Sequence, residues 1–109
     1  WDLIQYTISG ITYRFNSIEI EIKNSDVYQY NTGVGGVEEG ASIIQQAKNQ
    51  ERSEIIRDAS TQYDAVYFYR PIQGFTGIEN VLIRTFQGSD GYSPPNLITT
   101  TTINILVTE

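Results

Sequence analysis

Apolar and polar residues alternate along much of the chain, and this alternation predicts β-strands. In segment 17–23 the three isoleucines share one face, and the two glutamates and the lysine share the other. A strand with one buried and one solvated face shows this pattern. Segment 11–15 alternates as well, but with the opposite phase. Because a slip of one residue moves every side chain to the other face, we expect a bulge, a bend or a change of sheet at Asn16-Ser17.

Turn signals separate further strand candidates from this segment. Ser9-Gly10 predicts a turn after the first candidate. Pro71 ends another candidate or places it at a sheet edge, because proline cannot donate a hydrogen bond to a sheet ladder. If the long β-branched segment 99–108 lies at a sheet edge, it could pair with another chain. The strands expected outside 11–23 are 3–8, 27–30, 65–70, 81–83 and 99–108.

Segment 38–58 supports two interpretations. Ile43, Ile44 and Ala47 have helical spacing among good helix formers, which predicts one short helix within residues 38–52. The other interpretation is a pair of short strands, 42–47 and 53–58, joined by a polar loop. We favour the strands, because the apolar residues near 55 do not continue the helical stripe.

Short strands separated by frequent turn signals predict an all-β, immunoglobulin-like Greek-key β-sandwich of about seven strands. The chain has 109 residues, a length that supports a single domain over 1–109. Hydrophobic residues make up 39% and charged residues 18%, so one core is feasible and the chain is not of the disordered class.

Charge and missing residue types exclude several functions. A net charge of −6 repels phosphate backbones, so we expect no nucleic-acid partner. No apolar run approaches the roughly 20 residues that span a bilayer, so we expect no membrane insertion by this domain. The absence of cysteine excludes disulfides, and the absence of histidine removes the usual proton shuttle at neutral pH. We therefore expect a non-enzymatic domain without a cofactor.

Calcium is the metal that the composition leaves open, because it accepts carboxylate and carbonyl oxygens as ligands. Glu38 and Glu39, followed by a glycine, and Asp90, also followed by a glycine, are weak calcium candidates. The chain contains no EF-hand sequence, so solvated loop acids are the interpretation that we favour.

Five short motifs follow one another in the second half of the chain. They are Tyr69-Arg70-Pro71, Gly74-Phe75-Thr76-Gly77, Val81–Thr85, Ser89-Asp90-Gly91 and Ile103-Asn104-Ile105-Leu106-Val107. In this order they resemble the C-terminal half of bacterial immunoglobulin-like and cadherin-like surface adhesin modules. The usual Asp after the Gly-Phe-x-Gly turn is Glu79 here. Two glycines that allow positive φ would let Phe75 fold over the open end of a sandwich.

The resemblance implies a structural or adhesive module of a secreted or cell-surface bacterial protein, such as a lipoprotein. Such a module displays loops or spaces neighbouring domains, and its partner would be a protein or a glycan at the cell surface. Loops at one end of a sandwich are where these domains usually bind.

Tyrosines supply the alternative function. Tyr67 and Tyr69 share one face of a strand and Tyr63 lies in phase before them, so exposed rings could stack on sugars in a carbohydrate-binding module. The other interpretation, which we favour, is that these rings pack in the protein. Tyr92, in a loop beside two prolines, is the tyrosine that we most expect to be exposed.

Overall fold

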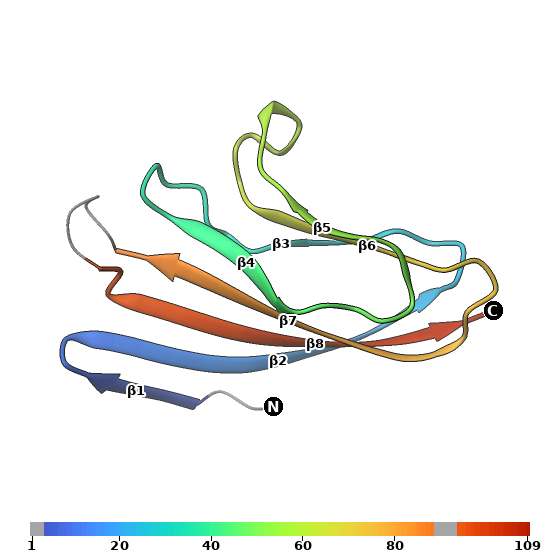
Figure 1. Ribbon diagram of the computed structural model, residues 1–109, viewed down its shortest axis with the longest axis horizontal. Coiled ribbons are helices and arrows are strands. Elements are labelled where there is room, and N and C mark those ends of the chain that lie inside the picture. Colours follow the sequence, from blue (N-terminus) through green and yellow to red (C-terminus); the bar gives the residue numbers. More distant parts are fainter. Residues whose placement is uncertain (1–3, 89–93) are drawn as a thin grey trace.

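The computed structural model describes residues 4–88 and 94–109, and these residues form two β-sheets (Figure 1). The described part contains one short 3₁₀ helix, η1 (Ala59–Thr61), and no helix long and apolar enough to cross a membrane. The strands are β1 (Ile4–Ile8), β2 (Ile11–Lys23), β3 (Tyr28–Asn31), β4 (Gly40–Gln45), β5 (Gln50–Ile56), β6 (Val66–Pro71), β7 (Gly77–Gln87) and β8 (Leu97–Thr108). The all-β prediction is confirmed.

One sheet has the order β1-β2-β8-β7-β4 and the other the order β3-β6-β5. Strand β2 runs parallel to β8, and every other neighbouring pair is antiparallel. This division of β2 to β8 between two sheets is that of an immunoglobulin-like Greek-key sandwich, with β1 added as an eighth strand at an edge. The C-terminal strand β8 lies between β2 and β7, so the edge position considered for 99–108 is wrong.

The predicted interruption at Asn16-Ser17 is also wrong. Strand β2 pairs with β8 in one unbroken register, from Thr12 opposite Leu97 to Lys23 opposite Thr108. The change of apolar phase therefore moves side chains to the other face of a continuous strand. The isoleucines of the second half point toward the core, whereas the apolar residues of 11–15 lie on the outer face of the sheet.

No helix forms within 38–52, so the short helix considered there is wrong and the two-strand interpretation is confirmed. Strand β4 pairs with β7 and strand β5 pairs with β6, which places the two strands in different sheets. The polar loop between them crosses from one sheet to the other. The helical spacing of the isoleucines in β4 is outweighed because each strand pairs with a neighbouring strand along one side, with one register irregularity in each ladder.

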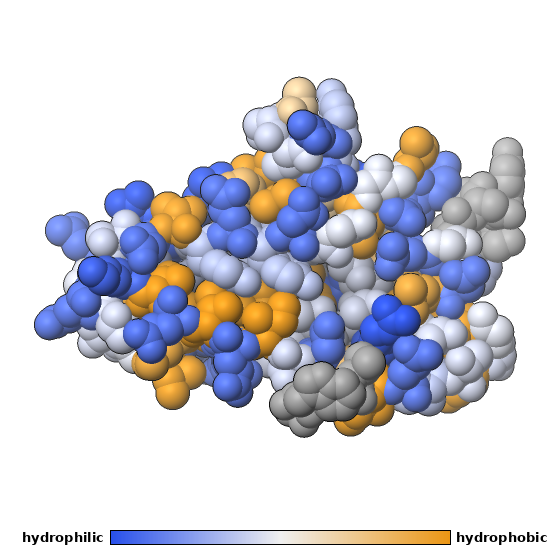
Figure 2. Space-filling model, turned by 180° about the vertical axis from the view of Figure 1, so that it is seen from behind, coloured by the Kyte–Doolittle hydropathy of each residue, from blue (hydrophilic) through white to orange (hydrophobic). Residues whose placement is uncertain are grey.

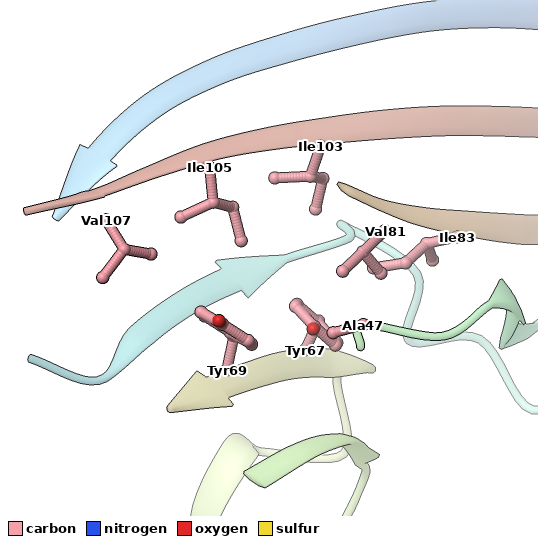
Figure 3. Packing of buried hydrophobic residues seen from close by; sticks show 8 residues of the cluster. All are labelled: Ala47, Tyr67, Tyr69, Val81, Ile83, Ile103, Ile105 and Val107. Atoms are coloured by element: carbon pink, nitrogen blue, oxygen red, sulfur yellow. The ribbon is translucent and has the colours of Figure 1, made fainter. Parts of the chain in front are cut away.

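The core lies between the two sheets, in the half that carries the C-terminus (Figures 1 and 3). Alternate residues of three central strands point into it, and each large apolar side chain buried there contributes about 1.5–3 kcal/mol. Phe75 packs against this cluster, and the glycines beside it, Gly74 and Gly77, have φ of 84° and 137°. Phe75 is thus partly buried as part of the packing around the core. The buried cluster consists of Ala47, Tyr67, Tyr69, Val81, Ile83, Ile103, Ile105 and Val107.

Candidate functional site

Two loops meet at the end of the sandwich away from the core. They are the β3–β4 loop, residues 32–39, and the β5–β6 loop, residues 57–65, which projects away from the five-stranded sheet at the top of Figure 1. The Ala65 N–H donates to the Val34 carbonyl over 2.8 Å, and the Thr32 N–H donates to the Ala65 carbonyl over 3.1 Å. The Val34 side chain is only 1% exposed, so the base of the joined loops is anchored by a buried aliphatic group.

Arg57 ties the two loops together. Its Nε donates to the Tyr63 carbonyl over 2.7 Å, its Nη1 donates to the Glu39 carbonyl over 2.5 Å, and its Nη2 donates to the Gly36 carbonyl. The planar guanidinium carries donors in a fixed fork, so these bonds fix the directions of three carbonyls at once. Loop 32–39 and loop 57–65 therefore form one unit around a half-buried cation.

The β5–β6 loop is also held by its own turn. Asp58 caps η1: its side chain accepts from the Ser60 N–H over 2.8 Å, and its carbonyl accepts from the Tyr63 N–H over 2.8 Å. Gln62 and Tyr63 have φ of 55° and 62°, in the left-handed region that non-glycine residues seldom adopt. Each such residue costs on the order of 1 kcal/mol or more, and the cap and the Arg57 bonds offset this cost.

This framework exposes two apolar side chains. Tyr63 is 61% exposed and Val37 is 94% exposed, although burying side chains of these types lowers the free energy of the folded protein. Val37 follows Gly36, and the backbones of Gly36 and Tyr63 bind the same guanidinium. We call Val37, Tyr63 and the two loops that carry them the tip surface. Among the sequence candidates, Tyr63 is exposed, so the favoured interpretation that its ring packs in the protein is wrong for this residue.

The acids near the tip surface act within the loops. Glu39 accepts with Oε1 from the Gly36 N–H over 2.8 Å and from the Gly35 N–H over 3.2 Å, and Glu38 is exposed. Asp90 and Tyr92 lie outside the described residues. Within the ranges 4–88 and 94–109, no group of three or more acidic side chains could hold a metal ion. The described structure thus does not support Glu38 and Glu39 as calcium ligands.

Tyr67 and Tyr69 are buried, so they cannot form a sugar-stacking platform, and that part of the carbohydrate hypothesis is wrong. Both side chains are 0% exposed and point from β6 into the core (Figure 3). The Tyr67 hydroxyl is 2.7 Å from Ser53 Oγ, and the Tyr69 hydroxyl donates to the Asn49 carbonyl over 3.0 Å. The rings face inward because β6 is the central strand of its sheet and its inner face opposes β7 and β8.

Burial determines how these phenols titrate. Desolvation raises the pKa of Tyr67 to about 12, partly offset by the hydrogen bond with Ser53. Desolvation also raises the pKa of Tyr69, and the charge of Glu79 adds to this effect. Neither phenol is suited to act as a base near neutral pH.

Glu79 is a buried acid that sequence reasoning did not assign. Its carboxylate, in a side chain 2% exposed, accepts from the Lys48 N–H over 2.9 Å and from the Asn49 N–H over 2.7 Å. Tyr69 Oη lies 3.3 Å from the same group. Glu79 thus anchors the β4–β5 loop on β7. The signal was present in the sequence, since Glu79 alternates in phase with the buried Val81 and Ile83.

A polar hollow of about 460 Å³ lies at the opposite end of the sandwich from the tip surface. Its carboxylate, Glu51, is 3.4 Å from the guanidinium of Arg70, and both side chains are largely exposed. The Glu51 carboxylate is thus paired with a cation rather than free to act as a base toward a nucleophile in the hollow. The residues around the hollow are Asn24, Ser25, Glu51, Arg70, Pro71, Gln73 and Gly74.

Fold and site together define an immunoglobulin-like β-sandwich with a braced pair of end loops. No family model and no curated protein sequence matches this chain. Among solved structures, the chain is similar to a cysteine protease inhibitor from Entamoeba histolytica. That match has 10% identity and a TM-score of 0.37, and it covers 84% of this chain and 96% of that chain. A TM-score this low supports no inference about function.

Proposed function

We propose that this chain is a non-catalytic display module that binds a protein partner through its tip surface. The observation that carries this proposal is the set of three hydrogen bonds that Arg57 donates to backbone carbonyls of the two loops, which we call the Arg57 clamp. The clamp fixes the loops in the unbound protein, and these loops carry two exposed apolar side chains, Val37 and Tyr63. A loop that is already ordered loses less entropy on binding, which strengthens association.

Tyrosine is well suited to such a contact. It offers a large rigid ring and a hydroxyl at a low cost in side-chain entropy, and it is enriched where few residues carry most of the binding energy. Val37 adds a small exposed aliphatic side chain on the other loop. An acidic domain with an apolar tip fits a partner whose surface has an apolar hollow with basic residues around it.

The resemblance of segment 67–107 to bacterial adhesin modules supports an extracellular or cell-surface location for this function. In that setting the module would display its end loops or space neighbouring domains. A protein partner is preferred over a glycan because the tyrosines that would stack on sugars, Tyr67 and Tyr69, are buried, leaving Tyr63 as the exposed ring of that set.

The test uses the labelled chain against a panel of extracellular protein domains and, in parallel, a glycan array. We expect binding to a protein of the panel, and we expect Tyr63→Ala and Val37→Ser each to weaken it about tenfold or more. The matched control is Ile78→Ser, because Ile78 is 69% exposed on β7, away from the tip surface. Binding that Tyr63→Ala leaves intact, or binding to glycans alone, would refute the proposal.

A further inference from the structure

Hydrophobic residues reach the surface of this protein in several places (Figure 2), and one group of them lies on the outer face of the β1–β2 hairpin. Ile4, Tyr6 and Ile8 of β1 are 62%, 45% and 58% exposed. Tyr6 stacks on Tyr13 and on Phe15, with ring centroids 5.3 and 5.9 Å apart. This face belongs to neither the core nor the tip surface.

Strand β1 is also an unprotected sheet edge. Among the described residues it pairs with β2 alone, and all five of its residues are exposed. Natural edge strands usually carry a lysine, a proline or a bulge that discourages pairing with another chain. The sequence of β1, Ile-Gln-Tyr-Thr-Ile, has no charge and no proline, and its register with β2 is unbroken.

The free backbone groups of this edge belong to Gln5 and Thr7. A two-residue turn with positive φ at Ser9 and Gly10 joins Ile8 to Ile11, and such a turn closes on a hydrogen-bonded pair. Bonded and non-bonded pairs alternate along an antiparallel ladder, so Thr7 and Gln5 direct their N–H and C=O groups away from β2. The Thr12 N–H, opposite Thr7, accordingly donates to the Asn96 carbonyl over 2.8 Å.

We propose that β1 pairs antiparallel with β1 of a second copy of this chain, about a two-fold axis at Tyr6. In this register Gln5 of one copy exchanges backbone bonds with Thr7 of the other, Tyr6 faces Tyr6, and Ile4 faces Ile8. The outer face then carries a continuous aromatic row, Tyr13–Tyr6 of one copy followed by Tyr6–Tyr13 of the other.

We assign a second copy of the chain as the partner because the sequence of β1 is complementary to itself in this antiparallel register. The two-fold register sets apolar residues against apolar residues on the outer face and amide against hydroxyl on the inner face. The net charge of −6 does not oppose the pairing of the two β1 strands locally, since β1 is uncharged. Two paired strands of this length bury less than the roughly 1,000 Å² of a stable interface, so we expect reversible association with a Kd on the order of 100 µM.

Cysteine crosslinking tests the register directly, because the natural chain has no cysteine. Facing residues of a non-bonded pair have Cα atoms about 4.5 Å apart, which a disulfide can span. Under mild oxidation we expect Tyr6→Cys to form a covalent dimer several-fold faster than Ile8→Cys, which faces position 4. Ile4→Cys mixed with Ile8→Cys should crosslink as Tyr6→Cys does. Equal yields from Tyr6→Cys and Ile8→Cys alone would overturn the register.

Charge variants test the association without a crosslink. Light scattering of the unmodified chain should rise from the monomer mass toward twice that mass as concentration increases. Tyr6→Lys and Tyr6→Glu should each weaken association about tenfold, because like charges would face each other, and mixing the two should restore it. Ile78→Lys should leave the mass unchanged. A monomer at every concentration, together with no crosslink from Tyr6→Cys, overturns the proposal and leaves the tip surface untouched.

Discussion

Arg57→Ala is the change that most directly weakens the frame of the tip surface. The substitution removes three hydrogen bonds from a charged donor to the carbonyls of Gly36, Glu39 and Tyr63. Buried bonds of this kind contribute about 1.5–3 kcal/mol each. Arg57 is half-buried and the released carbonyls regain water, so we assign about 1 kcal/mol to each bond. The expected loss in the free energy of unfolding is about 3 kcal/mol.

Urea unfolding measures the global loss, and amide hydrogen exchange locates it. Exchange of the Tyr63 and Ala65 amides should accelerate by up to about 100-fold, since about 1.4 kcal/mol corresponds to a factor of ten. Amides of β7 and β8, which open only when the whole domain unfolds, should stay more protected in Arg57→Ala than the amides of Tyr63 and Ala65. Arg57→Lys should recover at most one of the three bonds, because an ammonium lacks the planar fork.

The matched control is Arg70→Ala. Arg70 is an exposed arginine whose ion pair with Glu51 spans 3.4 Å, and removing such a pair costs about 0.5 kcal/mol or less. If Arg57→Ala costs no more than Arg70→Ala and the loop amides keep their protection, the Arg57 clamp does not brace the two loops.

Three further predictions concern polar groups of the sandwich. Glu79→Leu should lower the free energy of unfolding in urea by about 3 kcal/mol, because two backbone N–H donors lose their acceptor; a loss below about 1 kcal/mol would contradict the anchor. The pKa of Tyr67 is raised to about 12, so its contribution to the free energy of unfolding is complete below pH 10 and is lost as pH rises toward 12. Tyrosinate absorbance and alkaline unfolding should show this loss, and Tyr67→Phe should remove it. The side-chain hydrogen bond from Ser60 lowers the pKa of Asp58, so the contribution of Asp58 to the free energy of unfolding is present above the ordinary pKa of 3.8. This contribution fades as pH falls through the folded pKa, and Asp58→Asn should abolish the acid dependence.

Local patterns were enough to predict most of the strands. Alternation identified 17–23 and the strands of the second half, and the turn signals at Ser9-Gly10 and Pro71 marked two of their ends correctly. The ambiguity at 38–58 was resolved toward strands because β4 pairs with β7, distant in the chain, while β5 pairs with the next strand, β6, in the other sheet. Pairing of this kind depends on the whole fold and leaves little trace in local spacing.

The same patterns could not tell which face of a strand meets the core. Alternation placed Tyr67 and Tyr69 on one face, but only the packing of that face against β7 and β8 of the other sheet made it the buried one. The phase change within β2 was visible, but it was assigned to a bulge, a bend or a change of sheet because apolar residues normally mark the inner face. Strand β1 instead extends the sheet and carries an apolar outer face.

The Arg57 clamp had no signal in the sequence. Its acceptors are backbone carbonyls, which every residue has, and they come from two loops that the fold brings together. Tyr63 was identified for a different reason, its phase with Tyr67 and Tyr69, and it is exposed because it lies in the β5–β6 loop before β6 begins. The tip surface thus follows from tertiary contacts rather than from a motif.

The central claim is that a braced tip surface binds a protein partner. The most direct measurement compares the affinities of the unmodified chain, Tyr63→Ala and Ile78→Ala for a partner from the panel of extracellular domains, with folding of each variant checked by urea unfolding. The account predicts about a tenfold or greater loss for Tyr63→Ala and no change for Ile78→Ala. Equal affinities for all three chains would contradict it.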